Sequence, residues 1–525
     1  MIYYSKYRDF FIISAVYFVT FFAILLNNGL FWDGWVINNS SNDQLIQMFK
    51  DNGNYWYGYV FSLIKSTGTL VSLSRLITFI AYLIVGIFFY RVLSRYTHLL
   101  SSYALILTLY FITFPVNFAR ITIMNVPYAI CLVLFAIAYF MILKNNKSYV
   151  EVFISSIFLF LSLFMASLVF LVPVIVAHKF VFYRYSFNFN NVRSFLFSNK
   201  MLFVVPIAYV VVKLMYLEPG GMYDNNYNQI TFGRVMAMPL RFLEGIYGSI
   251  VLPINLSFSY AVSNLSLVLL ILYILNKLQI FNELVFKSTF LLSNNLKKIL
   301  IFSIVFLFLG MVAYILVGKT PSLTNWNSRH QILLPVGASF LLFSAISFVL
   351  IKINNVFIKK QLLLLPIAIF IIFNVNIYFS YIIDWYKQES FIENVMNSNE
   401  LMSSSTFIIV DNTKNLNALN RSKGFMGYTG IFKQKFGKED KLADENPMLD
   451  LPEYLKYKKD KVYGISDWAP SHPEYIVYLN YGSFTIDNLR AFKMIFNQLS
   501  NSNKNLNRIK NILSFEIKNI GSHND

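Results

Sequence analysis

The sequence predicts a polytopic α-helical membrane protein with about eleven transmembrane helices and a small soluble domain at the C-terminus. Three observations predict this class. The 525 residues are 56% hydrophobic and only 13% charged, whereas soluble domains carry about 25% charged residues. Apolar runs long enough to cross a hydrocarbon core recur through the first three quarters of the chain. Residues 385–525 contain no such run and hold 34 of the 70 charged residues, 44 basic and 26 acidic in all.

The predicted transmembrane helices correspond to eleven apolar runs. They lie near residues 10–26, 68–90, 99–118, 122–143, 149–165, 167–183, 201–217, 256–276, 299–317, 332–351 and 362–381. The first run follows Lys6 and Arg8. It has no small-x-small cleavage site after it, so we expect a retained signal anchor. The fifth and sixth runs are kept separate, because merging them would move the basic residues between 277 and 298 to the outer side.

The basic residues predict the orientation of these helices. With the N-terminus in the cytoplasm, the inner connections hold seventeen Lys and Arg residues and the outer connections hold eight. This is the positive-inside pattern. The net charge of +18 is therefore explained by topology, and no nucleic-acid partner is expected. The abundance of Phe, Tyr, Ile, Asn and Lys suggests an AT-rich bacterial genome. We expect a multi-pass protein in the lipid bilayer of the bacterial cytoplasmic (inner) membrane.

Two long connections and the C-terminal domain are predicted on the outer side. The transmembrane domain is residues 1–384, with outer loops at 27–67 and 218–255. The first loop contains NDQLIQMFKDN, a candidate interfacial helix. In residues 385–525, TFIIVDN and EYIVYLNY are typical of buried strands, and the apolar spacing over 487–499 indicates an amphipathic helix. We therefore expect a small extracytoplasmic α/β domain.

The motif FWDGW follows the first predicted helix and places Asp33 near Trp32 and Trp35. One interpretation is structural, with the tryptophans as interfacial anchors and Asp33 as a solvated loop residue. The other is catalytic: Asp33 would act as a general base toward an acceptor hydroxyl, and the tryptophans would pack against a sugar face or a lipid chain. Asp43, further along the loop, is a candidate substrate contact or a residue at a helix N-cap.

This layout resembles the GT-C class of membrane glycosyltransferases. The resemblance rests on an acid in a long first outer loop, many spans, an extracytoplasmic C-terminal domain, and the segments FWDGW and SLTNWNSRH. The layout is similar to that of serotype-converting O-antigen glucosyltransferases. The resemblance implies a polyprenyl-phosphate or polyprenyl-diphosphate sugar donor, a glycan acceptor and a catalytic first-loop acid, here Asp33. The paired-acid form of that motif is absent because Gly34 follows Asp33, so the use of Mg²⁺ or Mn²⁺ is left open.

A lipid-phosphate leaving group needs cationic donors, and the planar fork of arginine suits phosphate. The predicted donor-binding residues are Arg120, Arg234 and Arg329, with Arg241 as a further outer candidate. Arg329 and His330 lie near Trp326 in TPSLTNWNSRHQ, and His330 is a candidate substrate contact. The structural alternatives are an arginine at lipid headgroups and, for Arg120, a side chain that satisfies helix-end carbonyls.

Tyr223 and Asp224 are candidate sugar contacts in the second outer loop, and a flexible polar turn explains them equally well. Other motifs fail. GKT at 318–320 lacks the preceding glycine of a P-loop, because Ala313 stands there, and the sequence has no HExxH pair or GxSxG elbow. The single cysteine, Cys131, excludes an intrachain disulfide and a cysteine-based zinc site.

These observations predict transfer of a sugar from a polyprenyl-phosphate donor to a cell-surface glycan on the outer face of the membrane. Two alternatives stay open. An O-antigen repeat-unit polymerase has a similar span count, and the spacing from Arg234 to Gly245 fits a pattern of that family. A flippase or transporter of lipid-linked sugars would need a polar path through the bilayer, for which Arg75 and Lys213 are the candidates.

Overall fold

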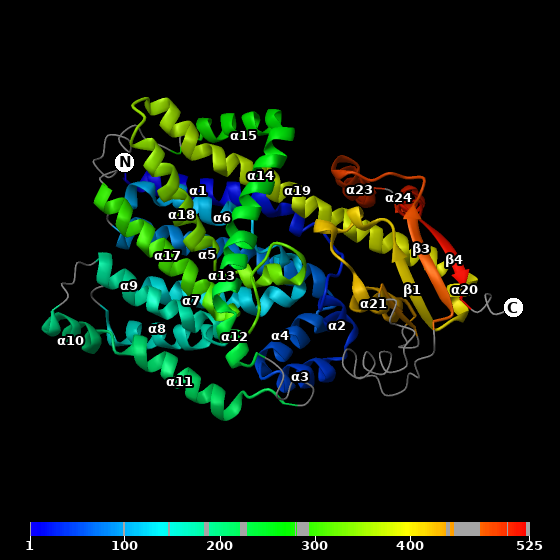
Figure 1. Ribbon diagram of the computed structural model, residues 1–525, viewed down its shortest axis with the longest axis horizontal. Coiled ribbons are helices and arrows are strands. Elements are labelled where there is room, and N and C mark those ends of the chain that lie inside the picture. Colours follow the sequence, from blue (N-terminus) through cyan, green and yellow to red (C-terminus); the bar gives the residue numbers. More distant parts are fainter. Residues whose placement is uncertain are drawn as a thin grey trace.

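The computed structural model describes residues 2–97, 100–144, 147–182, 188–220, 228–278, 280, 293–436, 441–445, 473–500 and 502–520. It is mostly helical with one small sheet. Figure 1 shows the helices of the first three quarters of the chain as one large body, with the C-terminal sheet at its end. The helix α19 runs from that body into the sheet domain (Figure 1). The chain is therefore organised as a helical bundle with a C-terminal α/β unit.

Among the described residues, six helical segments are long and apolar enough to cross a membrane. They are Tyr7–Ile24, Leu70–Tyr96, Ile123–Leu143, Met238–Ser263, Leu296–Ile315 and Val356–Met396, and the pair Phe189–Ser198 and Met201–Tyr216, bent by 58°, could be a seventh. Shorter apolar helices occupy Ser101–Thr113, Tyr149–Ser162, Ala166–Lys179, Leu265–Lys277 and Pro335–Leu350. The helical membrane class is thus supported, while the count of about eleven spans stays a prediction. The difference arises because apolar composition continues through turns and 3-10 segments that interrupt the helices.

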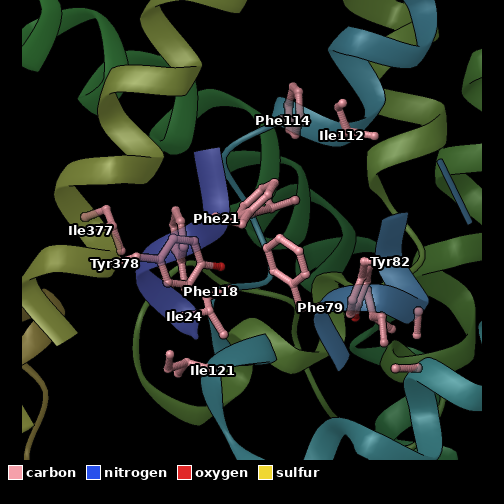
Figure 2. Packing of buried hydrophobic residues seen from close by; sticks show 14 of the residues in the cluster. Phe21, Ile24, Phe79, Tyr82, Ile112, Phe114, Phe118, Ile121, Ile377 and Tyr378 are labelled. Atoms are coloured by element: carbon pink, nitrogen blue, oxygen red, sulfur yellow. The ribbon is translucent and has the colours of Figure 1, made fainter. Parts of the chain in front are cut away.

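The bundle helices follow one another in chain order. They are α1 (Ile2–Phe21), α5 (Leu70–Tyr96), α6 (Ala104–Thr113), α7 (Val126–Leu143), α8 (Tyr149–Ser162), α9 (Val172–Phe182), α10 (Phe189–Ser198), α11 (Met201–Tyr216), α15 (Leu265–Lys277), α17 (Ser293–Ile315), α18 (Pro335–Leu350) and α19 (Val356–Met396). Aromatic rings pack the base of α1 against α19. The ring centres of Phe21 and Tyr378 are 5.6 Å apart, and those of Tyr378 and Phe118 are 5.9 Å apart. Figure 2 shows these rings together. This packing fixes the point at which the FWDGW loop leaves α1.

The two predicted outer loops contain more helix than expected. In the first, α2 (Gly34–Asn39) and α4 (Tyr55–Ser66) accompany α3 (Asn42–Asp51), and α3 confirms the predicted helix in NDQLIQMFKDN. In the second, residues 232–255 form α12 (Phe232–Met236), α13 (Met238–Ile246), a π-helical turn (Tyr247–Val251) and the start of α14 (Leu252–Ser263). Pro239 and Pro253 lie in the first turns of α13 and α14, where proline is compatible with a helix. Figure 1 shows α13 and α14 crossing the other bundle helices at a steep angle.

The C-terminal unit contains a four-stranded sheet in the order β2-β1-β3-β4. Its strands are β1 (Thr406–Asp411), β2 (Leu442–Asp444), β3 (Tyr475–Tyr481) and β4 (Leu513–Asn519), and its helices are α20 (Asn399–Ser403), α21 (Gly424–Phe436), α23 (Asn488–Ser500) and α24 (Ser502–Lys510). β1 pairs in parallel with β2 and β3, and β3 pairs antiparallel with β4. The two predicted strands and the predicted amphipathic helix are confirmed as β1, β3 and α23. The predicted boundary at residue 384 lies inside α19, which continues unbroken to Met396.

Candidate functional site

The loop that carries FWDGW is held by a buried arginine from α5. Arg75 donates hydrogen bonds to the Asn27 side chain at 3.2 Å, to the Gly29 carbonyl at 2.5 Å and to the Ile121 carbonyl at 3.3 Å. Its guanidinium also lies 5.9 Å from the centre of the Phe31 ring. Because these contacts occupy all three nitrogens, Arg75 acts as an anchor for the loop.

A tight turn at Trp32 directs the two tryptophans to different neighbours. Trp32 has a φ of +47°, in the left-handed region, which costs an L-residue roughly 1–2 kcal/mol. Bulky residues held there are often part of a functional site. The Trp32 ring lies 5.3 Å from Trp326 in the 3-10 helix η9 (Asn325–Gln331). The Trp35 ring is buried against Gly430 of α21, where an added Cβ would come within 2.7 Å of Trp35.

Asp33 faces Arg329. The Asp33 Oδ2 atom and the Arg329 Nη1 atom are 3.8 Å apart, and the side chains are 28% and 20% exposed. Asp33 precedes α2 but makes no side-chain cap to it, so its carboxylate is not engaged by its own helix. Burial raises the pKa of Asp33 above its ordinary value. The positive charges of Arg329 and Lys319, and a hydrogen bond from Trp326, act in the opposite direction. A carboxylate with a raised pKa is a stronger base than an ordinary aspartate.

Arg329 is oriented by its neighbours in η9. Its guanidinium lies 4.3 Å from the centre of the Trp326 ring, a cation–π distance. Its Nε donates a 3.2 Å hydrogen bond to Nε2 of His330. Burial, followed by Arg329 and Lys319, lowers the pKa of His330 to about 2. His330 is therefore neutral, and its Nε2 atom can accept this hydrogen bond.

Further cations gather around Gly318, which precedes Lys319, a residue whose charge acts on Asp33. A Cβ placed on Gly318, whose φ is +79°, would lie 3.0 Å from Arg234 Nε and 3.2 Å from Arg241 Nη1. The adjacent Lys319 donates a 2.5 Å hydrogen bond to Asn228. Burial, Arg329 and Arg234 lower the pKa of Lys319 to about 8. We call Arg329, Lys319, Arg234 and Arg241 the cationic cluster. Asp33 acts on the pKa of Lys319 in the opposite direction and raises it.

The C-terminal unit closes the other side of Trp32. Arg421 lies 5.0 Å from the Phe31 ring centre and 5.3 Å from that of Trp32. It is buried and donates hydrogen bonds of 2.8 and 3.0 Å to the carboxylate of Asp384 in α19. The first-loop motif is therefore enclosed by η9 and by the segment that precedes α21.

Several predicted residues lie apart from the Asp33–Arg329 pair. Arg120 is buried between Phe21 and Tyr82, with ring distances of 4.5 and 4.8 Å, and donates to the carbonyls of residues 116 and 117. These carbonyls lie in the connection between α6 and the 3-10 helix Phe118–Ile121, so Arg120 holds backbone next to helix ends. Asp43 is exposed in the first turn of α3, whose N-cap is Ser41. Tyr223 and Asp224 lie outside the described residues.

Sequence reasoning missed Lys319, and Arg421 with its partner Asp384. Lys319 lies in the GKT segment that failed as a P-loop, and only its position just before η9 could have suggested a role. Arg421 carried no signal, because it stands in a polar stretch of the C-terminal domain without a motif. Both residues reach the site through tertiary contacts.

Comparison of the chain with protein-family models, with curated proteins and with solved structures finds no match. The interpretation of the site therefore rests on its own chemistry.

A divalent cation does not fit the described surroundings of Asp33. Mg²⁺ and Mn²⁺ prefer several carboxylate or carbonyl oxygens. No group of three His, Cys, Asp or Glu side chains lies together in the described chain. Asp33 instead faces Arg329, with Lys319 also acting on its carboxylate. We derive no metal-dependent step from this arrangement.

Proposed function

We propose that the protein is a membrane glycosyltransferase of the GT-C class. It would transfer a sugar from a polyprenyl-phosphate-linked donor to a cell-surface glycan on the outer face of the bacterial cytoplasmic membrane. The observation that carries this proposal is the Asp33 carboxylate facing Arg329 beside the cationic cluster. A base next to several cations suits a reaction in which a hydroxyl loses a proton and a phosphate departs.

In the proposed reaction, Asp33 takes the proton of the acceptor hydroxyl as its oxygen attacks the anomeric carbon. The bond between that carbon and the donor phosphate oxygen breaks, and polyprenyl phosphate leaves with the bonding electrons. Arg329 and Lys319 are placed to balance the charge that develops on the phosphate. The Trp32 and Trp326 rings offer apolar faces to the sugar.

An apolar cavity supports a lipid-linked donor. It has a volume of about 100 Å³ and lies within the bundle. Its lining is mostly aromatic and aliphatic, with Tyr82, Phe306 and Phe340 among these side chains, and it also includes Thr97, Arg120 and His178. Ile332 and Leu333, which follow His330 in the chain, also line it. This arrangement provides room for part of an isoprenoid chain close to the segment that carries Arg329.

The flippase alternative is less well supported. Arg75, one of its two candidate polar-path residues, is engaged by loop carbonyls and Asn27. Lys213, the other, is exposed on the outside of α11. These two side chains do not suggest a continuous polar path through the described bundle.

The proposal is tested with Asp33→Asn, which keeps the shape of the side chain but removes the base. Sugar transfer from polyprenyl-phosphate donors is measured in membranes, together with the surface polysaccharide of the same cells. Asp43→Asn is the matched control, because Asp43 is an exposed acid in the same loop. We expect Asp33→Asn to lower kcat by about 10²–10⁴-fold, the usual contribution of a general base, while Asp43→Asn stays active. Full activity of Asp33→Asn would remove Asp33 from the mechanism. Transfer of whole repeat units by the wild type would instead favour the polymerase.

A further inference from the structure

The helix α23 presents apolar side chains on its outer face. Leu489, Phe492 and Phe496 are 62%, 36% and 53% exposed, and their spacing puts them on one side of the helix. The opposite side is buried in the C-terminal unit through Ala491, Met494 and Ile495, with Met494 only 1% exposed. The exposed apolar side is thus not needed for the packing of its own domain.

This face lies beside the apolar part of α19. The Phe492 ring is 6.0 Å from Phe379, and Asn488 donates a 2.7 Å hydrogen bond to the side chain of Asn376. Both partners belong to the long apolar helix α19, which is a candidate membrane span. Figure 1 shows α23 next to α19 where that helix leaves the bundle.

The apolar face of α23 is also linked to the exposed side of α1 by packed aromatic rings that pass through the buried Phe379. The ring centres of Phe379 and Phe22 are 5.9 Å apart, and those of Phe22 and Phe18 are 6.1 Å apart. Phe18 is exposed on the first candidate span. A series of ring contacts therefore connects α23 with Phe18 on the exposed side of the first candidate span.

The charges of α23 agree with a lipid surface. Lys493 is exposed and lies one turn from both Leu489 and Phe496, so its ammonium can reach headgroup phosphates while its chain covers apolar surface. Arg490 pairs with Asp487 at 3.8 Å, both exposed, at the start of the helix. An amphipathic helix with a basic residue beside its apolar face is typical of interfacial binding.

We infer that α23 is an interfacial helix that inserts Leu489, Phe492 and Phe496 into the bilayer and places Lys493 against anionic headgroups. This attachment would hold the C-terminal unit, and with it Arg421, against the membrane surface. The inference is independent of the proposed reaction, because it rests only on the apolar surface and its position beside α19.

The test uses the full-length chain, whose single cysteine is buried. Leu489→Cys then provides one accessible site for an environment-sensitive fluorophore, and Ser514→Cys on β4 is the exposed matched control. Both proteins are placed in vesicles of phosphatidylethanolamine and phosphatidylglycerol, with or without doxyl-labelled phosphatidylcholine. We expect blue-shifted emission and strong quenching by the doxyl lipid at position 489, and neither effect at position 514. Lys493→Glu should reduce the quenching at position 489.

Two outcomes would overturn the inference. One is emission at position 489 that is as water-exposed and as unquenched as at position 514. The other is shielding at position 489 that the doxyl lipid does not quench and that disappears when the protein is diluted in the vesicles, since a second copy of the chain would then cover the helix.

Discussion

Arg421 and Asp384 form a buried, two-pronged ion pair that joins the C-terminal unit to α19. The two hydrogen bonds measure 2.8 and 3.0 Å, from Nε and Nη2 of Arg421 to the two carboxylate oxygens. Lys423 adds a third charge, 3.9 Å from the same carboxylate. Because Arg421 also lies over the Trp32 ring, this pair connects the stability of the domain junction with the shape of the candidate site.

Removing Arg421 should destabilise the fold and the site together. Arg421→Ala leaves the buried Asp384 carboxylate with Lys423 as its remaining ion-pair partner and with hydrogen bonds from the Ala418 N–H and Gln388. Breaking a buried pair from one side costs about 3–5 kcal/mol. We expect a lower unfolding temperature in detergent, with reduced sugar transfer. Lys518→Ala is the control, because its 3.2 Å pair with Glu516 is exposed and should contribute less than about 1 kcal/mol. Equal unfolding temperatures for the two variants would contradict a structural role for the Arg421–Asp384 pair.

The sequence could locate part of this site, because Asp33 and Arg329 both follow apolar runs that place them at the same predicted membrane face. It could not select Arg329 over Arg120, since both are arginines near predicted helix ends. Only the tertiary packing shows Arg120 between Phe21 and Tyr82. The sequence could not predict the full length of α19 either. The charged residues after Asp384 look like the end of a span, but they continue the helix into a second domain.

The plot of sugar-transfer activity against pH should have a rising limb set by Asp33 and a falling limb set by Lys319. The basic form of Asp33 is required, so activity should rise with pH through its raised pKa. The protonated form of Lys319 is required, and its pKa of about 8 predicts that activity falls above that pH. Lys319→Arg keeps the positive charge to much higher pH, so the falling limb should disappear from the kcat/KM profile. An unchanged falling limb in Lys319→Arg would assign it to another group.

His330 is expected to act through Arg329 as a positioning residue. Its Nε2 accepts the hydrogen bond from Arg329 Nε, and a side-chain amide oxygen can do the same. His330→Gln should therefore keep most of the activity. His330→Leu should lower kcat by about 10²-fold, the scale of a misplacement near 1 Å at a reacting centre. Because the pKa of His330 is about 2, neither variant should move the limbs of the pH profile above pH 5. Equal activity of the two variants would mean that the hydrogen bond does not orient Arg329.

The centre of the Trp326 ring lies 4.3 Å from the Arg329 guanidinium and 5.3 Å from the centre of the Trp32 ring. Truncation of Trp326 should therefore weaken substrate binding. Trp326→Ala removes the cation–π contact, which contributes about 0.5–2 kcal/mol, together with one face of the aromatic pair and the hydrogen bond to Asp33. We expect KM for the sugar donor to rise by roughly 2–30-fold, by the conversion of 1.4 kcal/mol per factor of ten. Trp326→Phe should give a smaller rise, because an aromatic face is retained. Steady-state kinetics in vesicles separate KM from kcat. An effect on kcat alone would place Trp326 at the reacting centre, whereas unchanged kinetics would leave it a purely structural residue of η9.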